Sequence, residues 1–181
     1  MLRAIGRGSI SSVLKVVVDI AWVLACAGLG FVVIIAAISV YALANPSASI
    51  PGFERIATSS PAEVTRWILN WSALCVGAMI ICAYLRGIFG TLINGDPFVP
   101  ENAGRLRMIA IVVAGLELLR TFVNFVVPLL FVVTGGANGD GTTAATLHFD
   151  LTVWMGVLTI LVLSQVFSEG AALREDQKMT I

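Results

Sequence analysis

Four long stretches of mostly apolar residues, separated by polar segments, constrain the fold of this chain more than any other feature. They cover about residues 16–44, 67–93, 108–133 and 151–168. A helix needs about 20 mostly apolar residues to cross the roughly 30 Å hydrocarbon layer of a bilayer. Because the backbone must satisfy its own hydrogen bonds in hydrocarbon, each stretch predicts a transmembrane helix.

Composition supports a membrane protein. Hydrophobic residues make up 58% of the 181 residues and charged residues only 12%, whereas soluble domains average about 45–50% and about 25%. The strands of a membrane barrel alternate in polarity over about 10 residues, and these stretches are longer and do not alternate. We therefore predict an all-α integral membrane protein, with one four-helix domain over residues 1–181 that includes a cytoplasmic tail at 169–181.

The first apolar stretch, residues 16–44, also resembles a secretory signal peptide in one respect. It ends in Ala42-Leu43-Ala44, a pattern of small residues that is typical of a cleavage site. However, the apolar core of a signal peptide spans about 7–15 residues, and this stretch is about twice as long. We therefore expect the stretch to remain in the protein as its first transmembrane helix.

Lysine and arginine residues near the ends of the stretches predict the orientation of the chain, because they are enriched in cytoplasmic segments. The first connection holds only Arg55 and Arg66. Eight others lie near the N-terminus, in or next to the second connection, and in the tail: Arg3, Arg7, Lys15, Arg86, Arg105, Arg107, Arg174 and Lys178. We therefore expect both termini and the second connection, residues 94–107, in the cytoplasm. The net charge of zero gives no basic surface for direct nucleic-acid binding.

The connections carry signals for helix ends. Ser60-Pro61-Ala62-Glu63 is typical of a capping box, so the second helix is expected to begin near Pro61, before its apolar stretch. Residues 94–98 predict a turn that ends this helix, and Pro100 is expected to open the next one. The threonine-rich segment 142–149 is compatible with a short strand outside the membrane.

Glu117 and Arg120 are the only charged residues deep inside a stretch. Intramembrane charges usually pair and face the interior, and a spacing of three places these two on one helix face. Asn124 extends the same polar face, and Asp19 is a second candidate partner. A buried packing pair, a path for protons or ions, and a small-ligand site are all compatible with this pattern.

Residue patterns that indicate catalysis or metal binding are missing from the sequence. Cys26, Cys75 and Cys82 lie inside apolar stretches, where small apolar filler is the simplest interpretation, and His148 is the only histidine. We therefore expect no enzymatic activity, no cofactor and no metal site.

Small residues in the first two stretches favour close helix approach, within one chain or between copies in a homo-oligomer. They are Ala21, Ala25, Gly28, Ala73 and Gly77.

Two segments carry a family resemblance: Asn94-Gly95-Asp96-Pro97-Phe98-Val99-Pro100-Glu101-Asn102 with Arg105-Leu106-Arg107, and Val166-Phe167 through Gly170 with Leu173-Arg174-Glu175 and Thr180-Ile181. They resemble a bacterial four-helix membrane family known as domain of unknown function 2975. The resemblance implies four helices and the inner membrane, but no established activity. Such proteins are often encoded beside a small helix-turn-helix regulator of the Cro/repressor type, which suggests a cytoplasmic partner by analogy.

Two functional hypotheses follow from these features. In the first, a non-enzymatic membrane protein binds or regulates a cytoplasmic helix-turn-helix regulator through the second connection and the tail. The candidate residues for that surface are Asp96, Pro97, Phe98, Glu101, Asn102, Arg105, Gly170, Leu173, Glu175 and Ile181. In the alternative, a small transporter, channel or ligand sensor uses the polar face around Glu117 and Arg120.

The predicted orientation can be tested by cysteine labelling at position 96 in a variant without its native cysteines. Because the second connection is predicted to be cytoplasmic, Asp96→Cys should react with a membrane-impermeant maleimide only after the cells are permeabilised. A cysteine at position 55, in the first connection, should react in intact cells and serves as the control. Reaction at position 96 in intact cells would reverse the topology.

Overall fold

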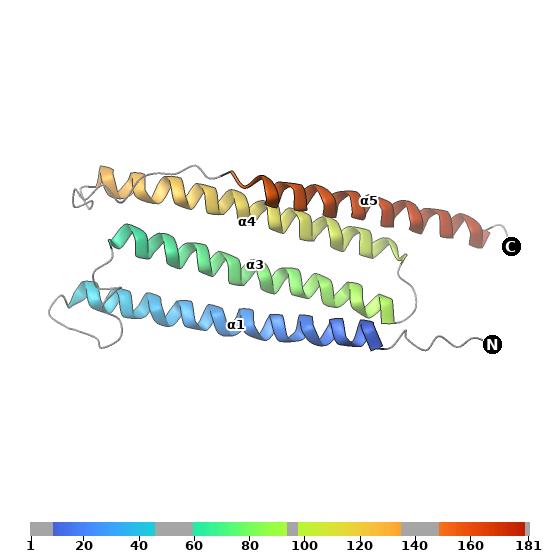
Figure 1. Ribbon diagram of the computed structural model, residues 1–181, viewed down its shortest axis with the longest axis horizontal. Coiled ribbons are helices and arrows are strands. Elements are labelled where there is room, and N and C mark those ends of the chain that lie inside the picture. Colours follow the sequence, from blue (N-terminus) through green and yellow to red (C-terminus); the bar gives the residue numbers. More distant parts are fainter. Residues whose placement is uncertain (1–8, 46–59, 94–97, 135–148, 180–181) are drawn as a thin grey trace. The chain divides into compact units, whose positions relative to one another are not determined.

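The computed structural model of the chain describes residues 9–45, 60–93, 98–134 and 149–179. These residues form helices α1 (Ser9–Ala44), α3 (Pro61–Ile93), α4 (Pro100–Val133) and α5 (Leu151–Met179), shown in Figure 1. Each of the four is long and apolar enough to cross a membrane. The prediction of four long apolar helices is therefore confirmed.

The helix boundaries follow the end signals in the sequence. Helix α3 begins at Pro61 and helix α4 at Pro100, as predicted. Ser60 contributes to the start of α3, because its hydroxyl oxygen accepts a hydrogen bond from the backbone N–H of Glu63 at 3.3 Å. Both helices therefore begin well before their apolar stretches. The segment in which a short strand was expected lies, up to residue 148, outside the described residues.

The chain groups into two compact units. The first, here called the α5 unit, comprises Met1–Ala25, Gly77–Gly115 and Asp150–Ile181. The second, here called the three-helix unit, comprises Cys26–Val76 and Leu116–Phe149. Helices α1, α3 and α4 contribute a segment to each unit, whereas α5 belongs to the α5 unit alone. The single four-helix domain stays a prediction.

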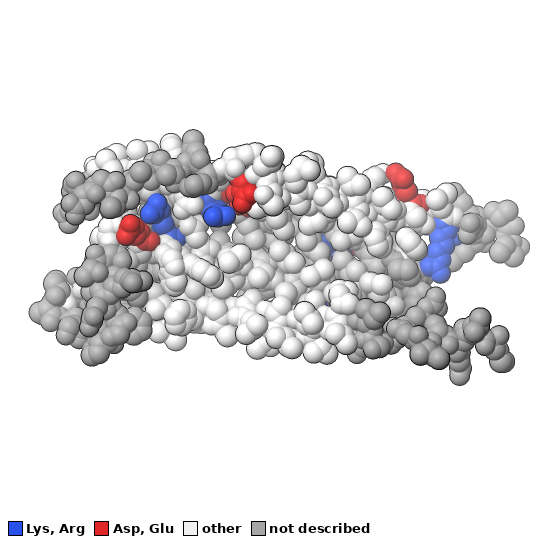
Figure 2. All heavy atoms as spheres, in the orientation of Figure 1, with Lys and Arg blue, Asp and Glu red and all other residues white. Residues whose placement is uncertain are grey.

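Large apolar side chains are exposed along all four helices. Phe31 on α1 is 56% exposed, Phe122 on α4 is 62% exposed and Val162 on α5 is 64% exposed. On the face drawn in Figure 2, few of the described residues at the surface are charged. Soluble proteins rarely expose apolar surface on this scale, so these helix surfaces suit lipid better than water.

A small residue allows a close helix contact in the three-helix unit. A Cβ atom added to Gly28 on α1 would lie 3.1 Å from the Sγ atom of Cys75 on α3. Cys75 is buried and unpaired. The expectation that Gly28 permits close packing of the first two helices is therefore confirmed. A Cβ atom at Gly30, two residues further along α1, would meet no atom within 4 Å.

We expect Gly28→Val to destabilise the protein and Gly30→Val, on the same helix, to have little effect. The added side chain at position 28 must displace Cys75 or separate α1 from α3, and overpacking of this kind costs about 1–3 kcal/mol. Thermal melting of the purified variants in detergent measures the difference. Adding Cys75→Ala to Gly28→Val should restore part of the loss. Equal melting points for the two valine variants would show that α1 and α3 do not pack at Gly28.

Candidate functional site

Asn102, in the first turn of α4, is the centre of a polar cluster in the α5 unit. It is fully buried, at 0% exposure. Its side-chain Nδ2 donates to the hydroxyl of Thr91 on α3 at 2.6 Å, and its Oδ1 accepts from Nη1 of Arg105 at 2.8 Å. The backbone N–H of Asn102 donates to the carbonyl of Val99 at 2.9 Å. Asn102 therefore joins the end of α3 to the start of α4.

Arg105 extends this cluster along α3. The same Nη1 atom donates a second hydrogen bond to the backbone carbonyl of Gly87 at 2.9 Å. A Cβ atom added to Gly87 would lie only 2.8 Å from Nε and 3.0 Å from Cζ of Arg105. The guanidinium group therefore lies directly against the α3 backbone, at a position where any larger residue would force it away. Arg105 thus crosses from α4 to α3 in a fixed position.

Phe98, just before α4, contacts α5. Its ring lies 5.6 Å from that of Phe167, centroid to centroid. A Cβ atom added to Gly170 would lie 2.9 Å from Cδ1 of Phe98. Nearby, the buried hydroxyl of Ser164 on α5 donates to the carbonyl of Ala103 on α4 at 2.8 Å. The start of α4 is therefore in direct contact with α5 as well as α3.

These contacts give internal roles to several residues of the family-like motifs. Phe98, Asn102, Arg105 and Gly170 all take part in contacts between helices of the α5 unit. The remaining described candidates, Glu101, Leu173 and Glu175, are exposed. Leu173 is 66% exposed and Phe98, despite its contacts, is still 43% exposed. The candidates Asp96, Pro97 and Ile181 lie outside the described residues.

Asp19 pairs with a different partner from the one considered in the sequence. Its Oδ1 lies 2.5 Å from Nε of Arg86 on α3, and both side chains are about two-fifths exposed, at 41% and 37%. The Cζ atom of Arg86 also lies 4.8 Å from the ring centroid of Trp22. The proposal that Asp19 is a partner of the Glu117–Arg120 pair is therefore corrected, since Asp19 links α1 to α3 in the α5 unit. In the sequence, Arg86 indicated only the orientation of the chain.

Glu117 and Arg120 approach each other in the three-helix unit, as their spacing predicts. Nη1 of Arg120 lies 3.7 Å from Oε2 of Glu117. The Glu117 side chain is 7% exposed, whereas the Arg120 side chain is 57% exposed. The expectation of a pair is confirmed, but only the Glu117 side chain is buried.

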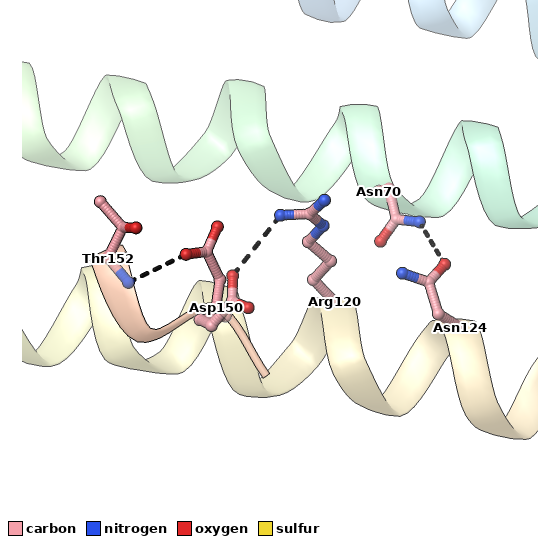
Figure 3. A network of polar contacts seen from close by, with 6 residues as sticks. Asn70, Arg120, Asn124, Asp150 and Thr152 are labelled. Carbon is pink, nitrogen blue, oxygen red and sulfur yellow. Dashed lines mark hydrogen bonds and ion pairs between the residues drawn. The ribbon is translucent and has the colours of Figure 1, made fainter. Parts of the chain in front are cut away.

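Asn124, one turn beyond Arg120, is bound to a residue that sequence analysis did not single out. Its Oδ1 accepts a hydrogen bond of 3.0 Å from Nδ2 of Asn70 on α3, as Figure 3 shows. Asn70 is a lone amide inside the apolar stretch of α3, and that isolation was the available signal. Because this hydrogen bond joins α3 to α4, the pair fits a role in packing.

Metal chemistry finds no support in the described part of the chain. No group of three or more histidine, cysteine or acidic side chains there could hold a metal ion. Cys26, Cys75 and Cys82 are free thiols. Among the described residues of the α5 unit, the Asn102 cluster contains Thr91, Asn102, Arg105 and the Gly87 carbonyl.

Comparisons with models of known families, with curated proteins and with solved structures find no match to this chain. The resemblance of the second connection and the tail stays a sequence-based interpretation.

Asn102→Ala should destabilise the protein clearly, and Gly104→Ala should not. Without the Asn102 amide, Thr91 and Arg105 lose a partner inside the protein, and an unsatisfied buried polar group costs about 1–3 kcal/mol. Gly104 is the matched control, because a Cβ atom there would meet nothing within 4 Å. Thermal melting in detergent compares the two variants. An unchanged melting point for Asn102→Ala would mean that the cluster does not join α3 to α4.

Proposed function

We propose that this chain is a non-enzymatic, multi-pass protein of the bacterial inner membrane that binds a cytoplasmic helix-turn-helix regulator. The partner surface is the exposed part of α5 after Phe167, together with the exposed edge of Phe98. Four helices long and apolar enough to cross a membrane support the membrane placement. The distribution of lysine and arginine supports a cytoplasmic position for this surface.

The observation that carries the proposal is the fixed base of the α5 extension. Helix α5 continues without a break to Met179. At the base of this extension, Phe98 lies against Phe167 and Gly170. A helix held at its base presents its exposed side chains in a defined geometry, so less conformational freedom is lost when a partner binds.

The exposed side chains indicate what kind of contact the extension can make. Leu173 is 66% exposed, and Glu169 and Glu175 are exposed on the same helical segment. One leucine beside two carboxylates suits a partner with an apolar pocket and basic residues around it. A regulator that binds DNA carries such basic residues. Binding to α5 would then compete with binding to DNA.

The alternative of a transporter, channel or ligand sensor has less support. The side chains that would line a path in the three-helix unit already have partners. Asn124 is hydrogen-bonded to Asn70, and Glu117 is paired with Arg120. The Asn124–Asn70 contact joins α4 to α3, and the Glu117–Arg120 pair lies within α4, so these polar side chains have partners without a transported species.

Leu173→Gln should release the regulator from the membrane, while Ala172→Gln should not. A small helix-turn-helix regulator of the Cro/repressor type is co-expressed with the chain, and the amount of regulator in the membrane fraction is measured. Full burial of a leucine contributes about 1.5–3 kcal/mol, so losing it should weaken binding roughly 10-fold to 100-fold. Ala172 is the matched control, because it is also exposed and is next to Leu173.

Both variants should keep the melting point of the wild type, because neither side chain is buried. Equal retention of the regulator by Leu173→Gln and wild type would exclude α5 as the partner surface. A fall in melting point for Leu173→Gln would instead indicate that Leu173 packs within the protein.

A further inference from the structure

Arg105 carries a positive charge that the described residues do not neutralise. Both of its hydrogen bonds start from Nη1 and end on neutral oxygen atoms, the Gly87 carbonyl and the Asn102 side chain. No acidic side chain in the described part of the chain forms an ion pair with it, including Glu101, four residues earlier on α4. The N–H groups on Nε and Nη2 therefore form no hydrogen bond with the described residues and can donate to a ligand.

The contact with Gly87 also determines where along the axis of α3 the Arg105 guanidinium group lies. Between Arg66 and Arg86, α3 has no charged residue over residues 67–85. At about 1.5 Å per residue, this interval is close to the roughly 30 Å thickness of the hydrocarbon layer. Gly87 follows Arg86 directly and therefore lies at the boundary of the apolar interval. The hydrogen bond from Arg105 to Gly87 places the guanidinium group at the same boundary.

The guanidinium group is also held in place before any ligand arrives. The two acceptors of Nη1 belong to different helices, and the group lies against the α3 backbone where Gly87 leaves room for it. A guanidinium group fits a phosphate with two parallel hydrogen bonds, and these are strengthened by charge. An arginine fixed in this way loses little side-chain freedom on binding.

We propose that Arg105 binds the phosphate of an anionic lipid headgroup, with its free donors on Nε and Nη2 directed at the phosphate oxygens. The proposal rests on the membrane placement proposed above and is independent of the regulator. A free phosphate ion has the same chemistry, but the boundary position of Arg105 favours the lipid, since headgroups are concentrated at that level.

Two neighbouring arginines are less suited to this role. Arg86 is already compensated by Asp19 at 2.5 Å and lies over the ring of Trp22. Arg107 is exposed, and no hydrogen bond to the described residues holds it in place. Arg107 can attract an anionic surface in general, but nothing fixes it in a geometry for one headgroup. This difference makes Arg107 the matched control.

The test uses the purified full-length chain in nanodiscs of phosphatidylcholine with and without phosphatidylglycerol, and measures bound lipid by native mass spectrometry. Wild type should prefer phosphatidylglycerol by roughly tenfold or more, the order expected when charge-assisted hydrogen bonds are gained. Arg105→Gln should lose most of this preference, and Arg107→Gln should keep it. The increase in melting temperature with phosphatidylglycerol, measured within each variant, should follow the same order.

An equal preference in wild type and Arg105→Gln would overturn the proposal, as would an equal loss in Arg107→Gln. If millimolar inorganic phosphate displaces phosphatidylglycerol or stabilises the protein without it, the site binds free phosphate and the lipid assignment is wrong. Should Arg105→Gln not fold, Arg105→Lys decides. Lysine keeps the charge but lacks the planar fork that can bind a phosphate with two parallel hydrogen bonds while Nη1 holds the Gly87 carbonyl, so a wild-type preference in that variant would refute the proposal.

Discussion

Close contact at small residues and hydrogen bonds between helices hold this protein together more than a large apolar core does. Lipid chains are as apolar as leucine, so helices in a membrane gain little by hiding apolar side chains from their surroundings. At three glycines an added Cβ atom would come close to another residue, at 3.1 Å for Gly28, 2.8 Å for Gly87 and 2.9 Å for Gly170. Large apolar side chains on the same helices remain exposed. The way in which the helices pack against one another is therefore determined at a few defined positions.

The start of α4 has the densest set of these positions. Within eight residues, Phe98, Asn102 and Arg105 reach α5 and α3. A motif in this segment can therefore be required for the fold of the α5 unit rather than for recognition of a partner. Residues that remain exposed, such as Leu173, are better candidates for recognition because no contact within the chain accounts for them.

The four helices could be predicted from the sequence because the length and apolar character of a stretch are enough to identify a helix that can cross a membrane. The starts at Pro61 and Pro100 were predictable from proline, the capping serine and the first acidic residue. The pairings of Asp19 with Arg86 and of Asn70 with Asn124 were not predicted. They depend on the rotation and register of two helices, and a helix that is apolar on all sides has little periodicity from which rotation can be inferred. The Glu117–Arg120 pair was predictable because both residues lie on one helix.

Three arginines show how differently a permanent charge can be accommodated in such helices. Arginine cannot lose its proton in a protein, so its charge must be compensated by an anion or hydrated. Arg86 has Asp19, and Arg120 has Glu117 at 3.7 Å and a side chain that is 57% exposed. Arg105 has only neutral oxygen atoms among the described residues. These oxygens orient the guanidinium group but do not cancel its charge, so Arg105 still requires an anion or water. The anionic headgroup proposed for this position would supply both the negative charge and the acceptor atoms.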